Sequence, residues 1–210
     1  MEEKDSVSLC MIVKDEERLL GSLLSRIKVD EIVIVDTGSV DDTLRIAKKF
    51  TDNVHSYRWQ DDFSKARNYS ISKATKDWIL ILDADERLSK KDLIRLRSII
   101  KNSPKDILGY RFIQKTYHGR KVVSIRGICR LFRNKKSIRF VYPIHETVRE
   151  SIKEKGGRIG KTGIIIKHYS SLNQKKTDYY LRLLKQKLQT HPGSSAQKEI
   201  ELENKLATLH

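Results

Sequence analysis

The stretch Trp78-Ile79-Leu80-Ile81-Leu82-Asp83-Ala84-Asp85-Glu86 decides how this chain folds. Its five apolar residues predict a buried strand, and the acidic residues after them predict the edge of a sheet, where open α/β folds bind ligands. A cap for the helix predicted at 89–101 is the alternative interpretation, but a cap needs only one carboxylate. Two carboxylates about 5 Å apart repel by roughly 3 kcal/mol at an effective dielectric constant near ~20, so their clustering favours a bound cation.

Strand-like and helix-like segments alternate on both sides of this stretch. Apolar runs predict strands at 7–13, 31–35, 53–58 and 78–82. Helical spacing and capping residues predict helices at 16–27, 41–50, 64–74 and 89–101. Such alternation is typical of an α/β fold with a mainly parallel sheet and helices on both faces.

The pattern changes after Lys101 to a mixed α+β type. Strands are predicted at 109–117, 122–132, 137–144 and 163–169, with a turn at 118–120. A helical stripe begins at Thr177 and is broken by Pro192-Gly193, and a last helix is predicted from Ser195. With 210 residues the chain is too short for two ordinary α/β domains. We expect one domain at 1–170, with halves 1–101 and 102–170, and a helical tail at 171–210.

Composition narrows the classes of partner. The net charge of +16 lies mostly after residue 86 and suits a polyanion, such as nucleic acid, an anionic membrane surface or a phosphorylated substrate. A simple lysine-rich surface is the alternative. Aromatic residues make up only 7%, which argues against binding to single-stranded nucleic acid. No apolar run reaches the ~20 residues of a membrane span, and the acidic start is no secretory signal, so we expect a cytoplasmic protein.

The two cysteines and the ends of the first strands complete the pattern. Cys10 and Cys129 lie among apolar residues and are interpreted as core residues rather than as a disulfide or a zinc site. Acidic residues follow three predicted strands, at 15–16, at Asp36 and at 83–86, so they should line one edge of the sheet. At the tip of its strand Asp36 can accept hydrogen bonds from a base or ribose, while Gly38 lets the backbone approach the ligand.

Two further positions keep alternative interpretations. Asp41 or Asp42 fits a helix cap better than a ligand contact. The guanidinium of Arg67 could reach the phosphate or base of a nucleotide, or it could form a surface ion pair with Asp61 or Asp62.

Several motifs, taken in order, resemble glycosyltransferase family 2. They lie at 8–17, 29–39, 41–43, 61–68 and 82–86, and then at 130–134, 138–140, 144–146 and 167–169. The similarity spans about residues 7 to 170 and is close to the subgroup that includes lipopolysaccharide-core and bacteriocin-peptide glycosyltransferases. It implies the GT-A fold, a nucleotide-sugar donor and transfer with inversion, with 1–101 as the nucleotide-sugar-binding half and 102–170 as the acceptor half.

The resemblance implies roles for the residues of the first half. Asp36 corresponds to the aspartate that binds the base, and Asp15 and Arg67 to further contacts with the nucleotide. Asp83 corresponds to the residue near the ribose and the metal. Asp85 corresponds to the principal ligand of manganese or magnesium, and hard carboxylate oxygens suit either cation.

The second half supplies three more site residues through the same resemblance. His168 is similar to a histidine near the diphosphate or the metal, and we count it as a third metal ligand beside Asp83 and Asp85. His145 and Glu146 resemble the pair that faces the acceptor. We count His145 among the nucleotide-sugar contacts and take Glu146 as the candidate base. The alternatives are a histidine satisfied next to the core and a surface ion pair between Glu146 and Arg149.

The resemblance favours a uridine diphosphate sugar as donor and leaves a saccharide, a lipid-linked or a peptide acceptor open. It suggests a role in cell-envelope or glycoconjugate biosynthesis, and the basic surface favours peripheral contact at the anionic inner membrane face. Two rival functions remain. A phosphohydrolase of the haloacid dehalogenase type would use Asp83 as a nucleophile, but that family follows its acidic pair with glycine and threonine. A non-catalytic basic binding module would leave the acidic strand ends unexplained.

Overall fold

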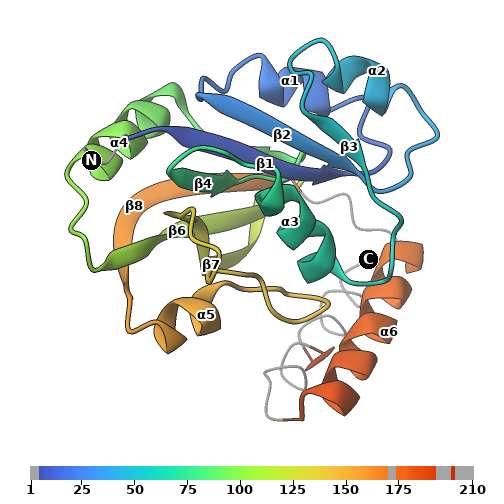
Figure 1. Cartoon of the computed structure of the whole chain (residues 1–210). Helices are drawn as coiled ribbons and strands as arrows, with labels where there is room; N and C mark the ends of the chain where they lie inside the picture. The colour runs from blue at the N-terminus through green and yellow to red at the C-terminus, as the bar shows by residue number, and fades with distance from the viewer. Residues whose placement is uncertain (1–4, 170–173, 193–199, 202–210) are drawn as a thin grey trace.

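The computed structural model describes residues 5–169, 174–192 and 200–201 (Figure 1). Eight strands form one sheet in the order β3-β2-β1-β4-β7-β6-β8-β5. The strands are β1 Val7–Val13, β2 Glu31–Asp36, β3 Val54–Ser56, β4 Trp78–Ile81, β5 Glu86–Arg87, β6 Ile107–His118, β7 Lys121–Arg133 and β8 Arg158–Tyr169. The helices are α1 Leu20–Leu24, α2 Thr43–Ala47, α3 Phe63–Ser72, α4 Lys90–Lys101, α5 Arg149–Glu154 and α6 Gln174–Thr190.

The first four strands are parallel and the rest of the sheet is mixed. β1 pairs with β2 and β4, and β2 pairs with β3, all in parallel. β7 joins β4 in antiparallel register and forms a hairpin with β6, which pairs in parallel with β8. The predicted α/β fold class with a mainly parallel sheet is therefore confirmed, and the sheet runs without a break through both predicted halves.

Helices cover both faces of the first strands, as the alternation predicted (Figure 1). Because side chains alternate along a strand, Leu9 packs on the side of α1, α2 and α4 while Cys10 packs with Ile71 of α3 on the other side. Cys10 is fully buried, which confirms its interpretation as a core residue. The division of the chain into domain halves and tail stays a prediction, and most of the helix predicted from Ser195 lies outside the described residues.

Two predicted helices are shorter than their apolar spacing indicates. The segment predicted as a helix at 16–27 contains α1, and the segment predicted at 41–50 contains α2. The remaining residues form tighter i→i−3 turns, since Ile27 N–H bonds to Leu24 and Phe50 N–H bonds to Ala47. The apolar stripe is still buried, so burial does not require the full helix.

The strand predicted at 137–144 is wrong. The segment is irregular and makes only an isolated bridge between Val141 and Thr147. The side chain of Asn68 takes the place of a neighbouring strand, because its amide accepts from Phe140 N–H at 2.8 Å and donates to Phe140 C=O at 2.9 Å. Within the described ranges, no helix has the length and apolar character needed to cross a bilayer.

Candidate active site

Acidic side chains gather where the parallel strands end. β1, β2 and β4 run in the same direction, so Asp15, Asp36 and Asp83 follow neighbouring strands at one edge of the sheet. This is the edge at which open α/β sheets bind ligands. The structure thus brings together the strand-end carboxylates that the sequence predicted to line one edge.

Asp36 is held by its own turn. Its buried carboxylate accepts hydrogen bonds from Gly38 N–H at 3.0 Å, from Ser39 N–H at 3.1 Å and from the Ser39 hydroxyl at 2.5 Å. Gly38 has a φ of +106°, a conformation that favours glycine. A carboxylate offers about four lone-pair sites, so Asp36 retains capacity for a donor group on a ligand.

Asp15 links the loops that follow β1 and β2. It has a φ of 54°, and its carboxylate accepts from Val40 N–H at 2.8 Å while its own N–H donates to the Ser39 hydroxyl at 2.9 Å. Asp41 accepts from Thr43 N–H at 2.9 Å at the start of α2. Asp42 occupies the N-cap position of α2 without a side-chain capping bond, so of the two candidates it is Asp41 whose side chain caps the helix. The carboxylates of Asp15 and Asp36 belong to one braced pair of loops.

Arg67 is buried on α3 and does not form the surface ion pair that spacing allowed. Asp61 pairs with Arg182 instead, and Asp62 caps α3 by accepting from Lys65 N–H at 3.0 Å. Arg67 donates through Nη2 to Asp83 at 2.9 Å and through Nε to Glu146. One guanidinium thus joins two carboxylates that are far apart in the sequence.

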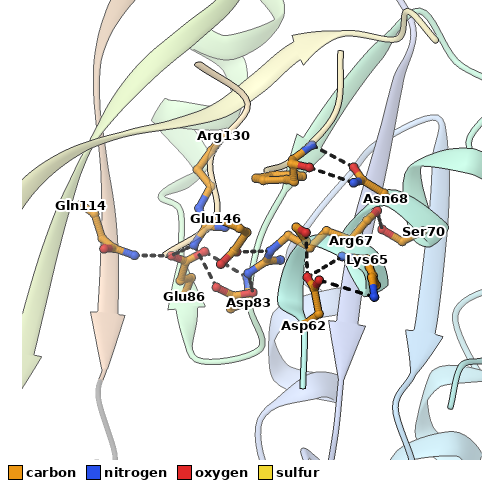
Figure 2. A network of polar contacts seen from close by, with 12 residues as sticks. Asp62, Lys65, Arg67, Asn68, Ser70, Asp83, Glu86, Gln114, Arg130 and Glu146 are labelled. Carbon is orange, nitrogen blue, oxygen red and sulfur yellow. Dashed lines mark hydrogen bonds and ion pairs between the residues drawn. The ribbon is translucent and has the colours of Figure 1, made fainter. Parts of the chain in front are cut away.

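A second arginine approaches Asp83 from β7. Arg130 Nη2 lies 2.9 Å from Asp83 Oδ2 and 2.9 Å from Glu86 Oε1. Gln114 of β6 donates to the same Glu86 oxygen at 2.5 Å. Figure 2 shows Arg67 and Arg130 converging on Asp83, with Glu86 and Gln114 to the left of it. Arg130 and Gln114 were missed as site residues, although Arg130 opens the matched motif at 130–134 and could have been found there.

Burial and charge act in opposite directions within this network. Burial raises the pKa of Asp83, but Arg67 and Arg130 outweigh it and hold that pKa well below its usual range. Burial raises the pKa of Glu86, which is fully buried, and Arg130 offsets that rise only in part. Arg67 Nη1 and Arg130 Nε are buried without a hydrogen-bond partner in the described part of the chain. Two cationic donors are therefore left unsatisfied inside this network.

Asp85 and His168 form a second pair beside this network. β5 pairs with β8 so that Glu86 lies opposite His168, which brings His168 Nε2 to 3.1 Å from Asp85 Oδ2. The other ring nitrogen lies 3.2 Å from the Thr116 hydroxyl. Burial lowers the pKa of His168, but its hydrogen bond to Asp85 and the charge of Asp85 raise it above its usual value.

Asp85 and His168 fit a divalent cation that takes its remaining ligands from a substrate phosphate and water. No group of three or more metal-ligating side chains occurs in the described residues, and both oxygens of Asp83 contact arginines. Magnesium-type sites often use only one or two carboxylates and take their remaining ligands from substrate phosphates and water. Asp85 and His168 could hold such a cation, while a role for Asp83 as its ligand stays a prediction.

Glu146 and His145 lie in a loop of unusual backbone geometry. Tyr142 has a φ of 73° and His145 a φ of 48°, both in the left-handed region. Glu146 pairs with Arg67 rather than with Arg149, so the surface-pair alternative is wrong. Ile144 is buried against Leu183 and Leu184 of α6. The loop that carries the candidate base is thus fixed by α3 on one side and by α6 on the other.

Leu184→Ala should test the support that α6 gives to this loop. Removing a fully buried leucine side chain should lower the free energy of unfolding by about 2–5 kcal/mol. Ile94→Ala removes an exposed side chain on α4 and should leave stability nearly unchanged. Urea unfolding of both variants measures the difference. Equal stability of the two variants would mean that α6 does not support the loop.

Comparison with known proteins relates this chain to a family and to two curated relatives. Residues 8–175 match the family model described as Glycosyl transferase family 2. A TPR repeat-containing protein of Synechococcus elongatus is 44% identical over 148 residues, which cover 70% of this chain and 36% of that protein. The SPbeta prophage-derived glycosyltransferase SunS of Bacillus subtilis is 31% identical over 148 residues, which cover 67% and 34%. The chain thus spans about a third of the length of these two relatives.

Solved structures share the fold at low sequence identity. The crystal structure of Staphylococcus aureus TarS in complex with UDP-GlcNAc has a TM-score of 0.62 at 16% identity, over 87% of this chain and 66% of that one. Glucosyl-3-phosphoglycerate synthase of Mycobacterium tuberculosis, in complex with Mn²⁺, UDP-glucose and phosphoglyceric acid, has a TM-score of 0.61 at 15% identity, over 88% and 79%. The shared fold is GT-A.

Proposed function

This chain belongs to glycosyl transferase family 2, and from that premise we propose that it transfers a sugar from a uridine diphosphate donor to an acceptor, with inversion. The observation that carries the proposal is the Asp85–His168 pair at 3.1 Å beside two buried arginines. The family match over 8–175 favours this proposal over the phosphohydrolase and over a non-catalytic binding module. The acceptor remains a saccharide, a lipid-linked or a peptide substrate.

The donor would lie along the edge formed by the ends of β1, β2 and β4. Asp36 and Asp15 would contact the base and the nucleoside, since both lie in the braced loops at the far end of this edge. TarS with UDP-GlcNAc and the mycobacterial synthase with UDP-glucose support a uridine diphosphate sugar. Asp83 would face the ribose, because its charge is already balanced by Arg67 and Arg130.

The diphosphate would lie next to Asp85 and His168. A manganese or magnesium ion, when bound there, neutralises the negative charge that develops on the departing diphosphate. Asp85 and His168 would hold that ion, and the Mn²⁺ in the mycobacterial synthase supports this cofactor. The guanidinium charges of Arg67 and Arg130 would act on the diphosphate from the protein side, and such fixed charges stabilise a developing charge without reorganisation.

Glu146 would accept the proton of the acceptor nucleophile. Arg67 donates to its Oε1, which fixes the orientation of the carboxylate and leaves Oε2 as the oxygen that takes the proton. An acceptor hydroxyl or thiol would then attack the anomeric carbon from the face opposite the diphosphate. His145 would contact the sugar donor from the same loop.

Glu146→Gln should separate transfer from donor binding. The amide cannot take a proton, so transfer to an acceptor should fall by about 10²- to 10⁴-fold. The dissociation constant for the donor should change by no more than about twofold, because the amide keeps its shape and its oxygen still accepts from Arg67. Glu154→Gln on the exposed side of α5 serves as the control and should retain full activity. Loss of donor binding in Glu146→Gln would reassign this residue to the donor site.

A further inference from the structure

The outer ends of β6, β7 and β8 share a sheet face that carries exposed apolar side chains. Lys115 of β6 pairs with Ile125 of β7 on one side and with Lys167 of β8 on the other. Two residues further along β6, Tyr117 pairs with Val122 of β7 and with Tyr169 of β8. Directly paired residues point to the same side of a sheet. The face, called the open face below, is made up of the side chains of Ile113, Lys115, Val122, Ile125, Lys167 and Tyr169.

Helix α5 packs on this side of the three strands near the beginning of β6. A Cβ built on Gly109 would lie 2.8 Å from Ile152 Cδ1 of α5, whereas Ile113, four residues further along β6, is exposed. The opposite side of the same strand is buried, with Phe112 and Gln114 almost without exposed area. The exposed apolar side chains therefore do not belong to the core or to the candidate active site.

The charge of this region has one sign. The sequence has no aspartate or glutamate between Asp106 and Glu146, and none between Glu154 and Asp178. These two stretches include all of β6, β7 and β8. Lys115 and Lys167 lie within the open face itself, and Arg120 and Lys121 lie at the adjoining hairpin turn. The partner of the open face should therefore be anionic as well as able to take up apolar side chains.

We propose that the open face binds the surface of an anionic lipid bilayer. Such a surface attracts lysine and arginine side chains and accepts apolar side chains at the boundary between head groups and acyl chains. Nucleic acid would attract the lysines but would gain little from Ile125 and Val122. Tyr117 and Tyr169 stack on each other at 5.4 Å rather than offering a platform for bases.

Binding in this orientation leaves the candidate active site accessible. His168 pairs with Thr116 and lies on the side of β8 opposite to Lys167 and Tyr169. The bilayer contact and the donor site therefore use opposite faces of the same strands. The inference does not depend on the proposed transfer reaction, and its test needs no substrate.

Flotation with lipid vesicles tests the proposal. The full chain should bind vesicles of phosphatidylglycerol and phosphatidylcholine, and should bind pure phosphatidylcholine vesicles about tenfold or more weakly. Ile125→Asp should weaken binding to the anionic vesicles by about tenfold or more, since it removes an apolar contact and adds a like charge. Lys115→Glu combined with Lys167→Glu should have an effect at least as large.

Matched controls come from α4. Ile94 is 65% exposed and Ile125 is 63% exposed, so Ile94→Asp makes the same chemical change at a similar exposure away from the open face. Lys90→Glu combined with Lys91→Glu matches the charge change. Both controls should bind anionic vesicles within about twofold of the parent chain, and a circular-dichroism melt of each variant should show an unchanged fold.

Three results would overturn the proposal. The first is equal binding of the parent to anionic and to neutral vesicles. The second is an equal loss of binding in Ile125→Asp and Ile94→Asp, because general charge would then explain it. The third is binding of a short oligonucleotide that Lys115→Glu with Lys167→Glu abolishes, in a chain that does not bind the anionic vesicles.

Discussion

Asp85→Ala should lower metal-dependent hydrolysis of a uridine diphosphate sugar by about 10³-fold, because a lost metal ligand removes several kcal/mol of transition-state stabilisation. Asp85 Oδ2 lies 3.1 Å from His168 Nε2, whereas both carboxylate oxygens of Asp83 contact arginines. His168 alone would be left to hold the cation. Steady-state hydrolysis at saturating manganese measures the effect.

The control for this variant is a carboxylate outside the site. Asp106→Ala removes a surface aspartate that pairs with Arg158, and it should leave the hydrolysis rate unchanged. His168→Ala should lower the rate in the same direction and should raise the manganese concentration needed for half-maximal activity. Equal activity of Asp85→Ala and the parent chain would contradict the assignment of the metal site.

Arg67→Met should cause the largest loss of stability of any single substitution at the site. Arg67 is 5% exposed and pairs with Asp83 and Glu146 together, so its removal leaves Glu146 without its buried partner and Asp83 with Arg130 alone. Breaking a buried pair in this way typically costs about 3–5 kcal/mol. Urea unfolding should show this decrease, and donor binding should be lost as well, because one cationic donor is gone.

Two further variants separate the charge effect from simple loss of packing. Arg45→Met breaks an exposed ion pair with Asp42 and should have little effect on unfolding. Adding Asp83→Asn and Glu146→Gln to Arg67→Met removes the uncompensated charges and should restore part of the lost stability. If the triple variant is no more stable than Arg67→Met, the stability lost in Arg67→Met comes from the missing side-chain volume and not from the uncompensated charges.

The fold could be predicted well where local pattern and tertiary environment agree. β1, β2 and β4 are buried on both faces and therefore appear in the sequence as continuous apolar runs. The segment at 137–144 has a similar pattern but no strand beside it. Its hydrogen bonds at Phe140 go to the side chain of Asn68, a contact between residues far apart in the sequence that local pattern cannot reveal.

The candidate site could be predicted only in part, because some of its contacts join residues that are far apart in the sequence. Asp83 and Asp85 were found because they end a strand, and His168 because of the family resemblance. Gln114 was not found, since a polar residue that alternates with apolar ones on a strand is expected to face solvent. It is buried because Glu86 and Arg126 both bond to its amide, and these partners come from other strands.

Calorimetric titration with uridine diphosphate sugars, with and without manganese, tests the central claim most directly. The claim is that the edge next to Asp85 and His168 binds a nucleotide sugar together with a divalent cation. We expect UDP-glucose or UDP-N-acetylglucosamine to bind in the presence of manganese, and to bind at least about tenfold more weakly after chelation or in Asp85→Ala, a difference of about 1.4 kcal/mol. Absence of heat from either sugar nucleotide with manganese present, or equal affinity in the parent chain and Asp85→Ala, would contradict the claim.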